Sequence, residues 1–206
     1  MSQYDLPQPE TEGQTSVEGA IEQRASRRSF ADAPVSIDDV AQLLWAAQGI
    51  THERDGIEMR AVPSAGATYP SEVFLDVAPD GCEDLPAGLY RYEPSTHDLE
   101  AVTDESVHED VVAAAYSQPV VAQAPVTLAV AADYGRTVSE YPDHGRRYVH
   151  MEAGHIAQNV HLVCEARDLY SCPVGAFADE QLDSALSLPP ELDPLYLVPV
   201  GRPPES

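Results

Sequence analysis

The sequence predicts an α+β fold in a single domain, and three observations lead to this prediction. The 206 residues provide for one ordinary domain, and an apolar content of 43% is enough for a core. Candidate strands and helices follow one another without the strict β–α–β alternation of a parallel sheet. No internal repeat divides the chain. Residues 1–15 are polar, with two Pro and one Gly, and are predicted to form an extended N-terminal arm before a domain of residues 16–206.

The best-marked helix of the N-terminal half follows Ser36. This residue is a predicted N-cap, with Asp39 at the capping-box position, and apolar residues then recur at helical spacing until Gly49 ends the helix. Residues 16–24 form an earlier helix by the same criterion, whereas residues 51–60 are charged and lack periodicity, which predicts a loop.

The rest of the chain alternates strand-like and helical segments. Strands are predicted for residues 72–78, 88–92, 99–102, 125–132, 170–174 and 195–200, with 88–102 forming a hairpin. Residues 125–132 form the most apolar run, which is typical of a central strand. Helices are predicted for residues 107–116, 147–168 and 179–188, and the second of them carries a long apolar stripe.

The charge balance is strongly acidic. All 11 basic residues are Arg, none is Lys, and 35 carboxylates bring the formal net charge to −24. Such a surface repels nucleic-acid phosphates and anionic lipids, which argues against nucleic acid or a membrane as partner. Because the acid is spread along the whole chain, we favour adaptation to high salt, where self-repulsion is screened, over an acidic protein that merely stays in solution.

Several classes of site are disfavoured. Three Cys residues without a CxxC motif indicate neither a disulfide framework nor a zinc knuckle, and His150 and His155 are five positions apart, which is not the HExxH spacing, so no metal site is predicted. The chain has no GxGxxG, P-loop or GxSxG motif. The N-terminal residues lack the features of a signal peptide and no run is long enough to span a membrane, which predicts a cytoplasmic protein.

The first candidate site is a cluster of basic residues. Arg24, Arg27 and Arg28 lie within five positions, next to Ser26, in a chain that otherwise avoids positive charge. Guanidinium groups bind phosphate oxygens in pairs of hydrogen bonds, and Ser supplies a neutral donor, so the pattern favours phosphate binding. Pairing of these arginines with nearby acids is the alternative.

Two small-residue segments are further candidates. Pro63, Ser64, Ala65 and Gly66 begin the segment PSAGATYP, whose small residues between prolines allow the backbone to approach a flat ligand. In the segment CPVGAF, Val174 precedes Gly175 and Ala176, whose backbone N–H groups can donate to a ligand; a plain strand-to-helix turn is the alternative. Arg202, at the end of the last strand, becomes a candidate if it joins the first cluster.

Taken in order, RASRRSF, LLWAAQGI, PSAGATYPSEVF, EAGHIAQNVHL, CPVGAF and LYLVPVGRP resemble the FMN-dependent nitroreductase family, and most closely its SagB-type branch of azoline dehydrogenases. The resemblance covers about residues 6–204. It implies a central mixed, mainly antiparallel sheet flanked by helices, and a homodimer with two shared FMN sites. Arg24, Ser26, Arg28 and Arg202 would bind the phosphate, Gly175 and Ala176 would lie beside flavin N5 and O4, and residues 63–66 would reach the flavin of the other subunit.

The resemblance also implies the chemistry. A reduced nicotinamide or an oxidisable substrate would give hydride to flavin N5, and a second small molecule would take the electrons. Ala67 replaces an Asn that is common in the family, and Arg147-Tyr148 stands where the azoline dehydrogenases have a Lys–Tyr pair, which leaves Tyr148 as the candidate proton donor or acceptor. The alternatives are a flavin-binding module without turnover, or a partner protein of a biosynthetic complex, and an acidic protein that binds no flavin.

Overall fold

A seven-stranded sheet forms the centre of the protein, in a computed structural model that describes residues 2–204. The strand order is β1-β6-β5-β4-β7-β9-β8. Every pairing between its neighbouring strands in the described residues is antiparallel. The strands are β1 (Gln3–Asp5), β4 (Ser71–Val77), β5 (Gly88–Glu93), β6 (Asp98–Thr103), β7 (Val126–Ala132), β8 (Tyr170–Ser171) and β9 (Asp193–Gly201). The structure thus confirms the predicted α+β class with a mainly antiparallel sheet flanked by helices.

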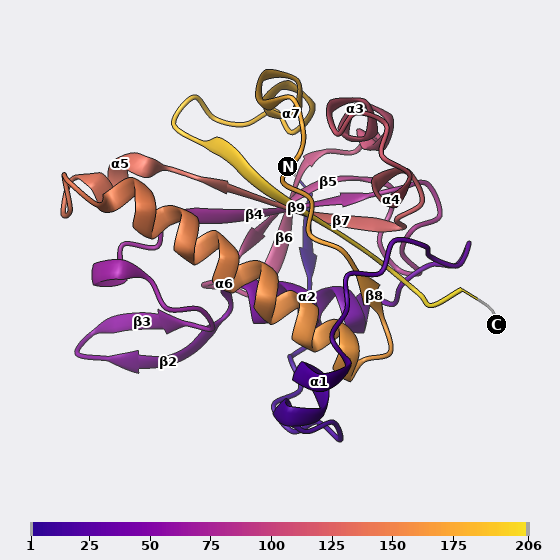
Figure 1. The fold of residues 1–206 in the computed structure, drawn as a ribbon, viewed down its shortest axis with the longest axis horizontal. Coiled ribbons are helices and arrows are strands. Elements are labelled where there is room, and N and C mark those ends of the chain that lie inside the picture. Colours follow the sequence, from indigo (N-terminus) through magenta and orange to yellow (C-terminus); the bar gives the residue numbers. More distant parts are fainter. Residues whose placement is uncertain (1, 205–206) are drawn as a thin grey trace.

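Helices cover both faces of this sheet (Figure 1). On one face, α2 (Ile37–Gln48) packs against the 22-residue α6 (Gly145–Ala166), and α1 (Val17–Gln23) contacts α6. On the other face lie α3 (His108–Ala114), α4 (Pro119–Ala122) and α7 (Asp179–Ala185). The short α5 (Tyr134–Val138) precedes α6. No helix among residues 2–204 is long and apolar enough to cross a membrane.

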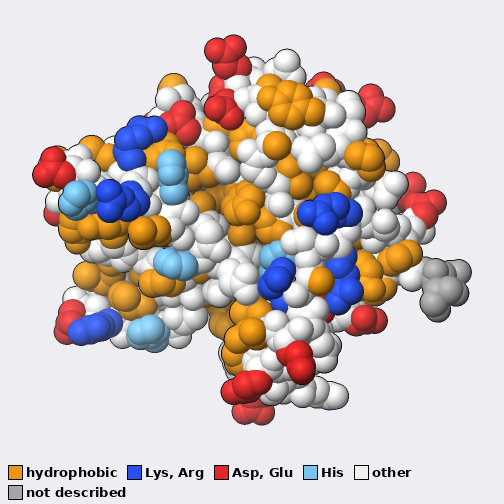
Figure 2. Space-filling view, in the orientation of Figure 1, with side chains coloured by type: hydrophobic (Ala, Val, Ile, Leu, Met, Phe, Trp, Pro, Cys, Tyr) orange, Lys and Arg blue, Asp and Glu red, His pale blue; other side chains and the backbone are white. Residues whose placement is uncertain are grey.

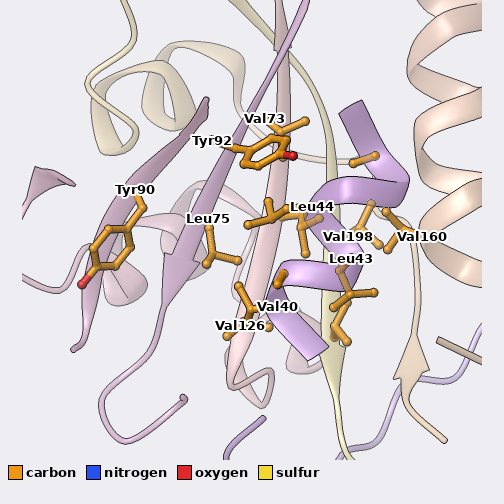
Figure 3. Close-up of a cluster of buried hydrophobic side chains, with 14 of the residues drawn as sticks. Val40, Leu43, Leu44, Val73, Leu75, Tyr90, Tyr92, Val126, Val160 and Val198 are labelled. Atoms are coloured by element: carbon orange, nitrogen blue, oxygen red, sulfur yellow. The ribbon is translucent and has the colours of Figure 1, made fainter. Parts of the chain in front are cut away.

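Strand β7 explains why two cores form. Val126, Leu128 and Val130 point into the core beneath α2 and α6, whereas Ala129 and Ala131 point into the core beneath α3, α4 and α7. All seven residues of the strand are buried, as expected for a strand covered on both faces. Figure 3 shows the first core, where side chains of α2, β4, β5, β7, β9 and α6 converge.

The helix after Ser36 has the predicted ends. The Ser36 side chain accepts a hydrogen bond from the Asp39 backbone N–H at 3.1 Å, and Gly49 is the C-cap. The predicted hairpin of residues 88–102 is confirmed as β5 and β6, and the predicted strands at 72–78, 125–132 and 195–200 are confirmed as β4, β7 and β9. The local sequence is decisive in these segments because caps and apolar periodicity agree with the tertiary contacts.

The prediction of a loop at residues 51–60 was wrong. These residues form an antiparallel hairpin of β2 (Ile50–Arg54) and β3 (Ile57–Arg60). Asp55 and Gly56 make the two-residue turn with φ angles of +55° and +80°, as a type I′ turn requires. Most of the hairpin is exposed, so its residues show no apolar alternation. The Asp-Gly pair was the signal that periodicity alone did not detect.

The N-terminal segment joins the sheet. Gln3–Asp5 pairs with β6 as an edge strand, and the Tyr4 ring meets the Tyr90 ring edge-on with centroids 5.4 Å apart. Further along, the backbone N–H and carbonyl of Glu10 both hydrogen-bond to the Gln42 side chain of α2. Residues 3–10 are therefore fixed on the domain, although most of their side chains remain partly or fully exposed.

Candidate functional site

The basic segment after α1 is held between α6 and the sheet edge. The Arg27 backbone N–H donates to the Ser171 carbonyl of β8 at 3.0 Å. Glu165 of α6 accepts from the Ala25 backbone N–H at 3.3 Å and pairs with the Arg27 guanidinium at 3.4 Å. The same guanidinium lies 4.5 Å above the Tyr170 ring. Arg27 is thereby occupied within the chain, which leaves its two neighbours in the cluster as candidates for a ligand.

Arg24 and Ser26 line a cavity of about 250 Å³ together with His161, Pro173 and Tyr196. Arg24 is the C-cap of α1, so the end of this helix fixes its backbone. Within the described residues Arg24 has no carboxylate within ion-pair distance. The structure thus places the unpaired Arg24 guanidinium and the Ser26 hydroxyl at the same cavity, where both could donate hydrogen bonds to a phosphate.

Arg28 lines a neighbouring cavity of about 450 Å³ with the other predicted segment, Val174, Gly175 and Ala176. Pro173 lines both cavities. Gly175 and Ala176 are exposed, and neither of their backbone N–H groups donates a hydrogen bond within residues 2–204. Two oriented donors are therefore available beside the basic cluster.

Arg202 does not line either cavity. Its guanidinium donates to Asp39 Oδ2 at 2.8 Å, and Arg167 Nε donates to Asp39 Oδ1 at 2.7 Å. Asp39 is 4% exposed, so one buried carboxylate connects α2, the end of α6 and the end of β9. In this structure the predicted fourth member of the phosphate cluster is bound to an acid of its own chain.

Pro63, Ser64, Ala65 and Gly66 lie elsewhere in the fold. They lead into a 3-10 turn at Ala65–Ala67, and Ser64 Oγ accepts from the Tyr69 backbone N–H at 3.0 Å. Gly66 has φ +61°, and a Cβ there would come within 2.9 Å of the Tyr141 hydroxyl. A larger residue at this position would be strained by the backbone angle and would require the Tyr141 side chain to move.

Tyr148 lies near this loop and far from the basic cluster. Its ring packs edge-on against Tyr141, with centroids 5.3 Å apart. Tyr148 and His161 are both in α6, and their separation of 13 positions corresponds to roughly 20 Å along the helix axis. One chain therefore does not bring the loop and Tyr148 together with Arg24 and Arg28.

The outer face of α6 lies between these two groups. Met151, Gly154, His155 and Gln158 recur at helical spacing and are exposed, and nothing lies within 4 Å of a Cβ built on Gly154. Ala157, by contrast, is buried in the core beneath α2 and α6 of the same chain. In Figure 2, apolar side chains and some of the basic ones lie in the interior of this face of the molecule, while most acidic side chains lie toward its edge.

The sequence analysis did not identify His161 as a residue of the site. It is 4% exposed, and its Nδ1 lies 2.8 Å from Ser171 Oγ. Burial, together with the positive charge of Arg24, lowers the pKa of His161 to about 4, although Glu165 opposes this shift. The imidazole is consequently neutral at neutral pH. Its position on the buried side of a long helix looks like that of a packing residue, and only the fold brings it to Arg24.

The low pKa of His161 predicts an acid-sensitive fold. Between about pH 6.5 and 4 the unfolded chain binds a proton at this residue and the folded chain does not, so stability falls as pH falls through that range. We expect the stability difference between the wild type and His161→Gln to change by about 2–3 kcal/mol across this range. Urea unfolding of both proteins at several pH values measures it, and parallel curves would contradict it.

Comparisons with known proteins give consistent matches. The family model described as "Nitroreductase family" matches residues 21–202. The chain is 40% identical over 187 residues to the Methanocaldococcus jannaschii protein MJ1384, whose name places it among nitroreductases, with 90% of each chain covered. A crystal structure named as a nitroreductase from Ralstonia eutropha JMP134 has a TM-score of 0.83 and 27% identity, covering 99% of this chain and 90% of its own.

The fold is also similar to that of a chain in the Escherichia coli microcin synthetase McbBCD complex with truncated pro-MccB17. The TM-score is 0.74 at 23% identity, over 90% of this chain and 73% of that one.

Proposed function

The chain belongs to the nitroreductase family, and from this membership we propose that it is an FMN-dependent oxidoreductase. Its reaction joins two half-reactions: a reduced nicotinamide or an oxidisable substrate is the hydride donor, and a second small molecule is the acceptor. The observation that carries the proposal is the convergence of Arg24, Ser26 and Arg28 with the free N–H groups of Gly175 and Ala176 in two cavities that share Pro173.

The basic cluster fits the phosphate of FMN. Arg24 and Arg28 supply the charge, Ser26 supplies a hydroxyl, and Arg27 positions the segment through Glu165 and Tyr170. His161, neutral beside Arg24, adds no competing positive charge but offers an imidazole to the same cavity. Arg202 can bind the phosphate only if its guanidinium gives up the hydrogen bond to Asp39.

The strand-to-helix turn fits the polar edge of the flavin ring. When bound, FMN accepts and gives hydride at N5. The N–H groups of Gly175 and Ala176 can donate to N5 and O4, and Arg28 raises the electrostatic potential in the same cavity, which favours an anionic reduced ring. Tyr148, whose ring contacts Tyr141, is the candidate to hold or release a proton, since a guanidinium such as that of its neighbour Arg147 has no acceptor.

We propose a homodimer in which each FMN site is shared. Tyr148 is roughly 20 Å along α6 from His161, which lines the cavity of Arg24, and Tyr141 contacts both Tyr148 and the position of Gly66. This separation supports a contribution of residues 63–66 to the flavin site of the other subunit. The exposed face of α6 with Gly154 allows a second helix to approach closely. Gln158 lies on this face, whereas Asn159 donates to the Ala46 carbonyl of its own α2 at 3.0 Å.

Among nitroreductases we place the chain nearest the SagB-type branch. The order of its motifs supports this placement, and its fold is similar to that of a chain in the microcin synthetase McbBCD complex. Oxidation of a peptide azoline would require a proton acceptor other than Lys, because the chain has none.

An anaerobic reduction spectrum tests the activity. The protein, purified and reconstituted with FMN, is expected to be yellow and to lose its visible absorbance on addition of NADH, NADPH or an azoline peptide, and to regain it with an acceptor such as a nitroaromatic compound. A yellow protein that no donor reduces would instead be a flavin-binding module. A colourless protein with no affinity for FMN would contradict the proposal altogether.

The shared site has its own test. FMN affinity should fall when the protein is diluted below the concentration at which it dimerises, and FMN should stabilise the dimer by linkage. Gly66→Trp and Arg28→Ala, each poor in FMN binding, should recover one good site when mixed, because one interface of the heterodimer carries neither change. A monomer with full FMN affinity in sedimentation would contradict this arrangement.

The acidic surface predicts a strong dependence on salt. With a net charge of −24, the chain repels itself, and this repulsion is screened as the Debye length falls from about 10 Å at 0.1 M to about 3 Å at 1 M. We expect the melting temperature to rise steadily between about 0.1 M and 1 M NaCl or KCl. A flat or falling melting temperature in both salts would contradict adaptation to high salt.

A further inference from the structure

A third polar cavity lies away from the two just described. It has a volume of about 240 Å³ and lies where β3 ends, β4 begins and β5 ends. Its polar lining includes Gln48, Arg60, Ser71, Arg91 and Arg136. It shares no residue with the cavities of Arg24 and Arg28, so nothing proposed above uses it.

Arg60 is the cation of this cavity that has no acid of its own. Its Nη1 donates to Gln48 Oε1 at 2.9 Å, and its guanidinium lies 4.6 Å above the Tyr69 ring. Within residues 2–204 no carboxylate lies within 4.0 Å of it. The charge of the buried Glu152 also acts on Arg60, but no hydrogen bond joins them directly: Gln48 lies between, with its Nε2 3.4 Å from Glu152 Oε1. The remaining N–H groups of Arg60 are free to bind a ligand.

Ser71 provides the second, independent observation. It is fully buried, lines the cavity, and its Oγ has no hydrogen-bond partner in the described structure. A buried hydroxyl without a partner is destabilising, so such groups in native proteins normally have one. A molecule in the cavity that accepts a hydrogen bond would be that partner.

The other two arginines of the cavity are paired with carboxylates. Arg136 lies 2.6 Å from Glu72 and 3.4 Å from Asp133, and Arg91 lies 3.7 Å from Glu72, 4.0 Å from Glu93 and 3.4 Å from Glu100. Arg60 is therefore the guanidinium of this cavity that is left to bind an anion.

We propose that this cavity binds a small oxyanion, a carboxylate or phosphate group, between the Arg60 guanidinium and the Ser71 hydroxyl. The free N–H groups of Arg60 match two oxygens of such a group, and the Ser71 hydroxyl donates to one of them. Because the volume is below the roughly 300–1,000 Å³ of pockets for larger ligands, the occupant is a small anion or the anionic end of a longer molecule.

Calorimetric titration with inorganic phosphate tests the site on the full-length protein. Arg60→Gln is expected to weaken one class of phosphate site at least about tenfold, the loss of a charge-assisted hydrogen bond. Arg54→Gln is the matched control, because it removes the same charge from an exposed side chain of the β2–β3 hairpin and should change nothing. Arg28→Ala should weaken only a separate class of phosphate site. The result for Arg60→Gln therefore tests this cavity even if the chain does not bind FMN.

Ser71→Ala is a second variant that tests the same cavity, and it can be used if Arg60→Gln folds poorly. Since the hydroxyl has no partner in the chain, its removal should leave the melting temperature without phosphate unchanged or higher, while phosphate affinity falls about threefold or more. In crystals soaked in sodium selenate, an anomalous peak should lie between Arg60 and Ser71. Selenate only at the Arg24–Arg28 cluster, or phosphate affinity unchanged in both variants, would overturn the proposal.

Discussion

Replacing Asp39 by Ala should lower the free energy of unfolding by about 3–5 kcal/mol, the usual cost of removing one partner from a buried ion pair. The carboxylate is 4% exposed and binds Arg167 and Arg202 at 2.7 Å and 2.8 Å, and Ser36 Oγ donates to it at 2.7 Å. Its removal leaves Arg202 without its acid and breaks the connection between α2, α6 and β9. Urea unfolding at neutral pH measures the loss.

Asp38→Ala is the matched control for this variant. It removes the same charge from the same turn of α2, but Asp38 is exposed, so only about 0.3–1 kcal/mol of helix-dipole interaction is lost. Burial alone raises the pKa of Asp39, but hydrogen bonds from Arg167 and Ser36 and the nearby guanidinium charges outweigh it and hold the pKa below its usual value. The loss in Asp39→Ala should therefore begin to shrink as pH falls below about 4, where this carboxylate is protonated in the unfolded chain, and should vanish once pH passes below the lowered pKa of the folded protein. Equal losses in both variants would contradict the buried-pair explanation.

Replacing Arg24 and Arg28 together by Ala should weaken FMN binding by about two to four orders of magnitude. Each substitution removes charge-assisted hydrogen bonds worth about 1.5–3 kcal/mol, or about one to two orders of magnitude alone. Both side chains lie at the two cavities that share Pro173, and neither has an ion-pair partner among residues 2–204. Quenching of FMN fluorescence on binding measures the affinity of each single variant and of the double variant.

Arg54→Ala separates a local effect from a general one. Arg54 pairs only with the neighbouring Asp55 at 3.7 Å on the exposed hairpin, so its loss changes the net charge equally without touching the cavities. If Arg54→Ala weakened FMN binding as much as Arg24→Ala, the total charge of the protein and not the cluster would determine affinity. If Arg28→Ala alone had no effect, the phosphate would lie only with Arg24 and Ser26.

Segments whose local signals agree with their tertiary contacts were predictable. Ser36 and Gly49 mark the ends of α2 because a side-chain cap and a glycine stop act within one turn. The apolar run of β7 indicates burial on both faces, which the structure confirms. The grouping of Arg24 and Ser26 in one cavity was also predictable, since they are two positions apart and belong to a cluster of arginines in a chain with few basic residues.

What the sequence did not predict depends on contacts between distant residues. His161 reaches Arg24 only because α6 packs against the segment that follows α1, so its low pKa has no local signal. Arg60 and Ser71 belong to different strands and meet at the end of the sheet. Arg202 was expected to join Arg24 and Arg28, whereas its guanidinium donates to the buried Asp39 carboxylate at 2.8 Å. Such pairings are determined by topology, which composition and spacing do not encode.

The two outer strands affect how the protein should be handled. An exposed sheet edge offers unpaired backbone groups to other molecules and is a common origin of aggregation. Here β6 is covered by only three residues, Gln3–Asp5, and β9 by the two residues of β8, which the Arg27 backbone N–H in turn contacts. A bulky N-terminal affinity tag, or trimming of the first five residues to aid crystallisation, would uncover β6. Expression clones with the tag at the C-terminus should therefore give the more monodisperse preparation.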